Sequence, residues 1–236
     1  MKKILALSMA VLMLLLRPAC GGKSNTSASS AAPATPAPAP ATSTAEPAAS
    51  TQPEGKTMTL RLASNHTEDF VTSLACIRFA ELVKEKTNGA IEVETYFNAV
   101  LGEEKATIEQ AQFGGIDLIR VNVSPLAEFV DEYNAILFPY IFANREHYWK
   151  VMDSEEVGKA MLHSEKMLAN NLYGLCFYDN GTRNFFFSKA VVRTPADMKD
   201  LAVRVQESNL MLGMVKAMGA NPTAMAASEL YSALQT

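Results

Sequence analysis

The stretch that decides the fold is residues 59–123, where three short apolar runs alternate with two helical patterns. Each run is rich in β-branched or large apolar residues, which is typical of strands. The runs read TLRLAS (59–64), IEVETY (91–96) and DLIRVNV (117–123). The segments between them repeat apolar residues at helical spacing and end at glycines. This order predicts an α/β fold built on a parallel sheet with right-handed crossovers.

The rest of the chain predicts further helices and strands. The acidic pair at residues 68–69 is expected to open the first helix, where acids suit the helix dipole. Downstream, we predict a mainly helical stretch at 144–170, strands at 172–178, 183–188 and 201–205, and helices at 210–218 and 228–236. The last helical pattern is still apolar where the chain stops, which predicts an incomplete domain.

Arg204 lies in the otherwise apolar run LAVRV, residues 201–205. Strand alternation places Arg204 on the same face as the small Ala202, which leaves room for another group to approach. A buried charge without a partner is strongly unfavourable, so Arg204 needs one. The partner is either an acidic side chain of the protein or an anionic ligand.

A second arginine, Arg183, lies in the polar segment DNGTRN (179–184) between two predicted strands. Two guanidinium groups suit the capture of a carboxylate, because each can bind it through two parallel hydrogen bonds. Internal acids such as Asp179 and Glu207 are the alternative partners. His66 directly follows the first predicted strand, at the carboxyl end where ligand sites of α/β sheets form, and it is also a candidate.

The N-terminus predicts export. Two lysines precede the apolar stretch 4–16, which is too short to span a membrane and is typical of a secretory signal peptide. Cys20 lies in ACGG (19–22), which resembles the cleavage box of bacterial lipoproteins, where the cysteine is lipid-modified. An ordinary secreted protein is the alternative. We expect residues 1–20 to be a lipoprotein-type signal peptide and residues 21–56, rich in Ala, Pro, Ser and Thr, to be a disordered tether.

Composition argues against several function classes. The net charge is −4 and there is no basic run, so no nucleic-acid partner is expected. The sequence has no G-x-S-x-G, H-E-x-x-H or G-x-G-x-x-G motif, and neither an enzyme nor a cofactor is predicted. Cys76 and Cys176 are expected to be reduced rather than bridged, and no Cys/His cluster predicts a metal.

An ordered set of motifs resembles the solute-binding proteins of TRAP (tripartite ATP-independent periplasmic) transporters, of the dicarboxylate-binding type. The match runs from Thr59 to the last residue with family-like spacing, and the ordered set is more specific than any single motif. The motifs are FAELV (79–83), TNG (87–89), LG (101–102), IEQ (108–110), GID (115–117), FPY (138–140), DNGTR (179–183), VRV (203–205), MGANP (218–222) and SELYSALQT (228–236).

The resemblance implies a periplasmic-binding-protein fold: two α/β lobes with mixed sheets, joined by crossing strands and a hinge helix, that close on a small organic acid. It implies that Arg204 makes the ion pair with the ligand carboxylate and that Arg183 lies in the same cleft. Asn65 and Asn122 match cleft-facing positions after the first and third strands. Asn209, just after the Arg204 strand, is a further candidate.

The implied function is that of an extracytoplasmic receptor, lipid-anchored through Cys20 in the periplasm or at the outer face of the cytoplasmic membrane. It would deliver a C4-dicarboxylate, sugar acid or keto acid to the integral-membrane permease subunits of a TRAP transporter. Residues 57–180 are expected to form mainly lobe I, and residues 181–236 the crossing strands and the start of a truncated lobe II. The alternatives are a surface lipoprotein with a structural or adhesive role, and a non-functional fragment of such a receptor.

Overall fold

The computed structural model describes residues 57–188 and 191–235. The predicted signal peptide, the predicted tether and Cys20 lie outside the described residues. We name residues 57–177 the first region and residues 191–235 the second region, because each contains its own sheet. Within the described part of the chain, no helix has the length and apolar character needed to cross a membrane.

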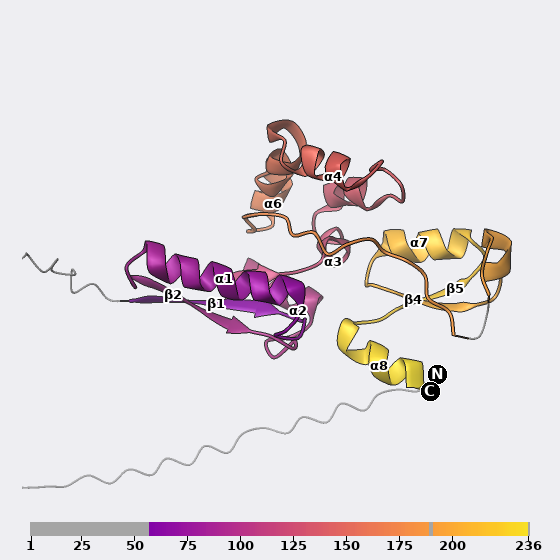
Figure 1. The fold of residues 1–236 in the computed structure, drawn as a ribbon, viewed down its shortest axis with the longest axis horizontal. Coiled ribbons are helices and arrows are strands. Elements are labelled where there is room, and N and C mark those ends of the chain that lie inside the picture. The colour runs from indigo at the N-terminus through magenta and orange to yellow at the C-terminus, as the bar shows by residue number, and fades with distance from the viewer. Residues whose placement is uncertain (1–56, 189–190, 236) are drawn as a thin grey trace, which may run out of the picture. The chain divides into compact units, whose positions relative to one another are not determined.

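The first region is built on a parallel three-stranded sheet, as the sequence predicts (Figure 1). β1 (Met58–Ser64) is the central strand and pairs with β2 (Ile91–Tyr96) and β3 (Leu118–Arg120). The register places Ser64 beside Arg120, so β1 and β3 end at the same edge of the sheet. Side chains that follow these two strands are thereby brought together.

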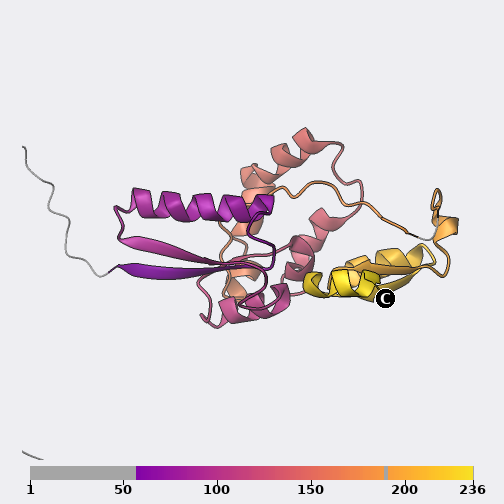
Figure 2. The ribbon, with the colours of Figure 1, turned by 60° about the horizontal axis from the view of Figure 1, so that its bottom comes forward.

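Two helices connect the strands, α1 (Val71–Lys86) and α2 (Glu104–Gln112). Figures 1 and 2 show α1 lying along the sheet. The helix begins after the acidic pair at 68–69, so the expected acids are absent from its first turn. Its fully buried residues are Thr72, Ser73 and Cys76. The predicted apolar face is therefore partly wrong, because Thr72 turns inward to pair with His66 while Val71 stays 63% exposed.

Residues 123–169 form a succession of short helices, and the helical prediction for residues 144–170 is confirmed. They are α3 (Val123–Leu126), the 3-10 helix η1 (Asp131–Leu137), α4 (Arg145–Met152), the π-helical turn η2 (Glu155–Lys159), α5 (Ala160–Leu162) and α6 (Glu165–Ala169). These helices bury Val130 and Tyr133 against Ile108 of α2. This cluster is the largest core of the first region.

The two strands predicted at 172–178 and 183–188 are wrong. Neither segment has regular secondary structure among the described residues. Tyr173 and Leu175 are exposed, and Phe186 is 90% exposed. An apolar run becomes a strand only where another strand satisfies its backbone N–H and C=O groups, and no described strand runs beside these segments.

The second region has a two-stranded parallel sheet and two α-helices. β4 (Ala202–Val205) pairs with β5 (Asn221–Ala224), and α7 (Asn209–Ala217) and α8 (Ala227–Gln235) follow each strand in turn. A short 3-10 helix, η3 (Pro195–Met198), precedes β4. The core contains Val203, Val205, Met211 and Val215, while Arg204 lies on the opposite, less buried face of β4. The alternation predicted for this strand is confirmed, and the α/β fold class is confirmed with it.

Candidate functional site

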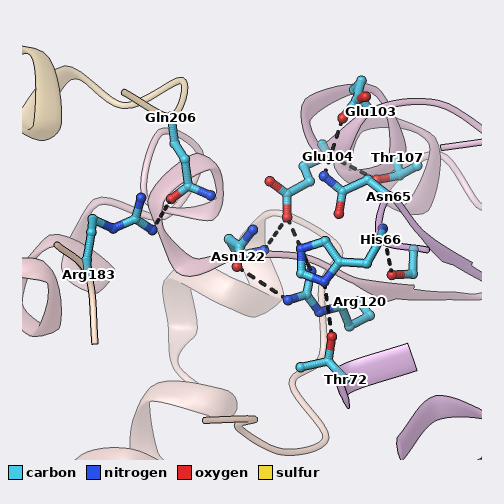
Figure 3. Close-up of polar contacts among 11 residues, drawn as sticks. Asn65, His66, Thr72, Glu103, Glu104, Thr107, Arg120, Asn122, Arg183 and Gln206 are labelled. Atoms are coloured by element: carbon cyan, nitrogen blue, oxygen red, sulfur yellow. Dashed lines mark hydrogen bonds and ion pairs between the residues drawn. The ribbon is translucent and has the colours of Figure 1, made fainter. Parts of the chain in front are cut away.

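The candidate site begins at the carboxyl edge of the first sheet. Asn65 and His66 follow β1, and Asn122 follows β3 as the residue that precedes α3. In a parallel α/β sheet this edge is where ligand sites form. Glu103 and Glu104, at the start of α2, reach the same edge through hydrogen bonds to Asn65 and to the backbone of Asn122 (Figure 3).

Glu104 and Arg120 form a buried ion pair beneath this edge. Each residue is 8% exposed, and Glu104 Oε1 lies 3.7 Å from Arg120 Nη1. The same oxygen accepts a 2.6 Å hydrogen bond from the backbone N–H of Asn122. Burial raises the pKa of Glu104, against the opposing effects of the Asn122 hydrogen bonds and the Arg120 charge. Burial likewise lowers the pKa of Arg120.

Neither member of this pair was predicted from the sequence. Arg120 is a charge within the apolar run DLIRVNV, which is the same signal that drew attention to Arg204. Because a buried charge needs a partner, Arg120 was predictable as a candidate in the same way as Arg204. No comparable signal marks Glu104, because an acid in the first turn of a helix is usually on the surface.

His66 serves Arg120 as a hydrogen-bond acceptor. Its Nε2 lies 3.4 Å from Arg120 Nη1, and its Nδ1 lies 3.2 Å from the hydroxyl of Thr72. A guanidinium group can only donate, so Nε2 accepts and the imidazole proton belongs on Nδ1, from which it donates to Thr72. Burial, followed by the Arg120 charge, lowers the pKa of His66 to about 4. His66 is therefore neutral at pH 7 and positions Arg120.

The two predicted asparagines lie close to this pair. Asn65 donates from Nδ2 to Glu103 Oε2 at 3.3 Å, whereas its Oδ1 is buried without a hydrogen-bond partner among the described residues. Asn122 Oδ1 accepts from Arg120 Nη2 at 3.4 Å. An unpaired buried acceptor costs about 1–3 kcal/mol, so Asn65 Oδ1 would be stabilised by a hydrogen-bond donor.

Arg204 and Arg183 lie outside the first region. Arg204 is on β4, and Arg183 is in the segment without regular structure that precedes the second region. Arg204 donates from Nε and Nη2 to the carbonyl oxygen of Met225, at 3.0 and 2.6 Å. Arg183 donates from Nη2 to Gln206 Oε1 at 2.5 Å. Burial lowers the pKa of both guanidinium groups, and for Arg204 the nearby charge of Arg183 adds to the effect.

Neither of these two arginines forms an ion pair with an acid of the described residues. Asp179, one of the internal partners considered from the sequence, instead pairs with Arg145 at 2.7 Å. The carboxylates of Glu104, Glu103 and Glu207 act on Arg204 only as nearby charges, and Glu104 acts on Arg183 in the same way. Two adjacent positive charges without a bound carboxylate form a place where an anion is stabilised.

The space around Arg204 is small in this arrangement. A cavity of about 10 Å³ is lined by residues of both regions, among them Glu103, Glu104, Arg204 and Gln206. It has room for about one water molecule. A second cavity, of about 270 Å³, shares Pro125 and Glu207 with the first and continues along α7.

Asn209 lies at the second cavity rather than beside Arg204. Its backbone N–H donates to Glu128 Oε1 at 2.7 Å, and its side-chain amide donates to Glu128 Oε2. The structure thus gathers Asn65, His66 and Asn122 in one network, places Arg183 and Arg204 close enough to repel each other, and assigns Asn209 to a separate contact.

Other chemistry is not apparent among residues 57–188 and 191–235. These residues contain no group of three or more His, Cys, Asp or Glu side chains arranged to hold a metal ion. Cys76 is buried, Cys176 is exposed, and both are free thiols.

Comparison with known proteins identifies the class. Residues 62–236 match the DctP family, described as bacterial extracellular solute-binding protein, family 7. The chain belongs to this family, whose members are extracytoplasmic solute-binding proteins of transport systems and not enzymes.

Two curated relatives show how far the likeness extends. The C4-dicarboxylate-binding periplasmic protein of Rhodobacter capsulatus is 34% identical over 160 residues, which cover 67% of this chain and 47% of that protein. A solute-binding protein of Chromohalobacter salexigens is 33% identical over 171 residues, which cover 72% of this chain and 50% of that protein. The chain thus spans about half the length of the curated relatives it matches.

Solved structures give the same class. A TRAP periplasmic solute-binding protein from Bradyrhizobium sp. BTAi1, in complex with α/β-D-galacturonate, is 38% identical to this chain with a TM-score of 0.70. The alignment covers 74% of this chain and 57% of the Bradyrhizobium chain.

Proposed function

We propose that this chain acts as the solute-binding receptor of a TRAP transporter, which captures an organic-acid anion and delivers it to membrane permease subunits. The observation that carries the proposal is that neither Arg183 nor Arg204 forms an ion pair with an acid of the described residues. An incoming carboxylate would supply the missing negative charge. A structural role would instead require internal acids to form ion pairs with the two arginines.

Within this function, Arg204 makes the main ion pair with the carboxylate and Arg183 supports it. Met225 holds the Arg204 guanidinium through Nε and Nη2, which leaves Nη1 to donate to a ligand. Asn65 and Asn122 contribute polar contacts at the opposite wall, and His66 keeps Arg120 in place beneath them. Asn209 contributes at the second cavity, through its hydrogen bonds to Glu128.

We infer that the ligand is a hydroxylated acid, of which a hexuronate is the leading candidate. The unpaired Oδ1 of Asn65 and the carboxylates of Glu103 and Glu104 can accept hydrogen bonds from ligand hydroxyl groups. The same carboxylates disfavour a second negative charge on the ligand. The galacturonate in the Bradyrhizobium structure and the D-glucuronate in a Citrobacter koseri relative, 34% identical, support this ligand class. C4-dicarboxylates and keto acids are the other candidates.

We also propose where the protein is located and how its chain is divided. The receptor would be lipid-anchored through Cys20, with the tether of residues 21–56 allowing the binding part to reach the permease. Residues 57–180 would correspond mainly to lobe I, and residues 181–236 to the crossing strands and the start of lobe II.

Isothermal titration of the folded 236-residue chain with D-galacturonate, D-glucuronate and succinate tests the function. We expect at least one uronate to bind, and succinate to bind more weakly because Glu103 and Glu104 oppose its second carboxylate. Circular dichroism at the same concentrations confirms that the protein is folded. The absence of binding to all three acids by folded protein would overturn the proposed function.

A further inference from the structure

Two cysteines that are 100 residues apart in the chain, Cys76 and Cys176, meet at one side chain. Cys76 lies on α1 and is 1% exposed, whereas Cys176 is exposed in the segment that follows α6. The hydroxyl group of Tyr178 is a hydrogen-bond partner of both thiols. Two sulfur atoms that share one hydroxyl group lie within a few ångströms of each other. The fold therefore brings together two cysteines that the sequence predicts to remain reduced.

The segment that carries Cys176 has freedom to adjust. Residues 175–178 have no regular secondary structure and form no backbone hydrogen bond with the described residues. A disulfide needs its sulfur atoms about 2.05 Å apart and its Cα atoms about 4.4–6.8 Å apart. A segment that is not bound into a sheet can reach this geometry by a small shift, in which the Tyr178 hydroxyl group leaves its place between the sulfur atoms.

The surroundings of Cys76 favour its thiolate but keep reagents away. Burial raises the pKa of the Cys76 thiol, whereas the charge of Arg120 and the hydrogen bond with Tyr178 act in the opposite direction. Burial also raises the pKa of Tyr178, so its hydroxyl group keeps its proton and can donate a hydrogen bond to sulfur. The thiolate is the attacking form of cysteine. Cys176 is therefore the thiol that a reagent in solution reaches first, and Cys76 is the thiol that can attack Cys176 from inside.

We propose that Cys76 and Cys176 form a disulfide by exchange with a small disulfide, that the Tyr178 hydroxyl group assists the attack by Cys76, and that the bond pins residues 172–178 to α1. Proteins of this family are extracellular, and disulfides persist outside the cytoplasm. The proposal concerns a covalent modification and does not depend on the ligand that the protein binds.

The exchange takes place in two steps. The Cys176 thiolate attacks one sulfur of a small disulfide such as oxidised glutathione, which forms a mixed disulfide and releases one glutathione thiolate. The Cys76 thiolate then attacks the sulfur of Cys176, which breaks the mixed disulfide and releases the second glutathione thiolate. The protons lost by the two cysteines end on the two released thiolates. Two protein thiols are oxidised, one glutathione disulfide is reduced, and no other oxidant is needed.

The first test detects the bond itself. In the 236-residue chain with Cys20→Ser, Cys76 and Cys176 are the two remaining thiols. After incubation of the folded protein with oxidised glutathione, we expect both thiols to resist alkylation. Tryptic digestion should then release residues 62–78 joined to residues 167–183. A glutathione adduct that persists on Cys176 while Cys76 stays reduced would overturn the proposal, and so would a bond between two copies of the chain.

The matched control for this reaction is Cys176→Ser, made in the same Cys20→Ser background. Cys176 is exposed, so serine should leave the fold unchanged. With its exposed partner removed, the buried Cys76 should remain a free thiol under the same treatment. Rapid modification of Cys76 in this variant would show that glutathione reaches it directly, and it would contradict the proposed order of attack.

Thermal unfolding tests whether the bond pins the segment. A disulfide that closes a loop of this length restricts the unfolded chain, so the midpoint of the oxidised protein should lie about 5–15 °C above that of the reduced protein. Dithiothreitol should reverse the increase, and Cys176→Ser should show none. An unchanged or lowered midpoint in fully oxidised protein would contradict the pinning of residues 172–178.

Tyr178→Phe tests the part of the hydroxyl group. Phenylalanine keeps the ring but removes the donor to the Cys76 thiolate. Closure of the disulfide, followed by mass spectrometry of alkylated samples over time, should be about 3- to 10-fold slower. The mixed disulfide on Cys176 should form at an unchanged rate, because that step does not involve Cys76. Equal or faster closure would remove Tyr178 from the exchange.

Discussion

The most direct test of a single residue is Arg204→Ala. If the guanidinium forms the proposed ion pair with the ligand carboxylate, removing it leaves a buried charge without its partner, at a cost of about 3–5 kcal/mol. That corresponds to a loss of roughly two to four orders of magnitude in affinity, measured by calorimetric titration with D-galacturonate.

The control for Arg204→Ala is Arg78→Ala. Arg78 lies on the exposed face of α1 and pairs with Glu81, three residues along the helix. A surface pair of this kind contributes little, so both the affinity and the unfolding midpoint should be nearly unchanged. Equal affinities in the two variants would remove Arg204 from the site.

His66 gives the protein a defined sensitivity to acid. Its pKa in the folded protein is about 4, below its ordinary value of 6.5, so the unfolded chain binds a proton more readily. The stability that this group contributes is present above pH 6.5 and is lost as the pH falls from there towards 4. Because His66 is only half-buried, we expect a total loss of about 1–2 kcal/mol.

Urea unfolding at several pH values between 7 and 4 tests this dependence. The unsubstituted protein should lose stability across the window faster than His66→Gln, which has no imidazole to protonate. The comparison between the two proteins removes the contribution of the carboxylates that both share. Parallel stability curves would show that His66 is not the titrating group.

At the scale of secondary-structure elements, α2 is the helix on which the site depends. It carries Glu103 and Glu104 at its start and buries Ile108 completely in the core of the first region. We expect Ile108→Ala to destabilise the protein by about 2–5 kcal/mol, because the cavity it leaves cannot fully collapse. Urea unfolding measures the loss, and Glu109→Ala on the exposed face should change stability by less than about 0.5 kcal/mol. A similar effect for the two variants would contradict the assigned packing.

The elements also show what the sequence could and could not predict. Residues 59–123 were predictable because each strand there is bounded by helices with clear stops, such as Gly89 at φ 78° after α1. β5 was missed because Asn221-Pro222-Thr223-Ala224 lacks an apolar alternation and contains a proline. Proline is tolerated there because β5 has a strand on one side only. β5 could be predicted only from β4, which needs a partner strand, and not from the residues of β5 themselves.

The candidate site was predictable in part for a similar reason. Arg204 was predictable as a charge in an apolar run, Arg183 as a charge in a polar segment between two predicted strands, and His66 from its place after the first strand. Asn65 and Asn122 were proposed only from the family resemblance. Glu104 was not predictable, because it joins the site only when the fold places the start of α2 beside the residues that follow β3. Polar groups that act from a different element leave no periodic signal in the sequence.

At the scale of the whole molecule, the two regions have separate cores and share little apolar contact. Each has its own sheet and its own core, and the described cores meet at Leu137. Carboxylates complete the connection, at Glu103 and Glu128. Interfaces that are small in apolar area and rich in hydrogen bonds suit proteins that open and close, since either arrangement can be reached without exposing a core.

The hold on Arg204 by the carbonyl oxygen of Met225 has a consequence for how such a protein can change over generations. A main-chain carbonyl is present whatever side chain occupies position 225, so point substitutions there do not remove the acceptor. The acceptor for the Arg204 guanidinium is thus independent of the side chain at position 225, whereas the hydrogen bonds of Asn65 and Asn122 depend on their own side chains. If Arg204 binds the ligand carboxylate as proposed, substitutions at position 225 would leave that contact unchanged while side chains that face the rest of the ligand could change.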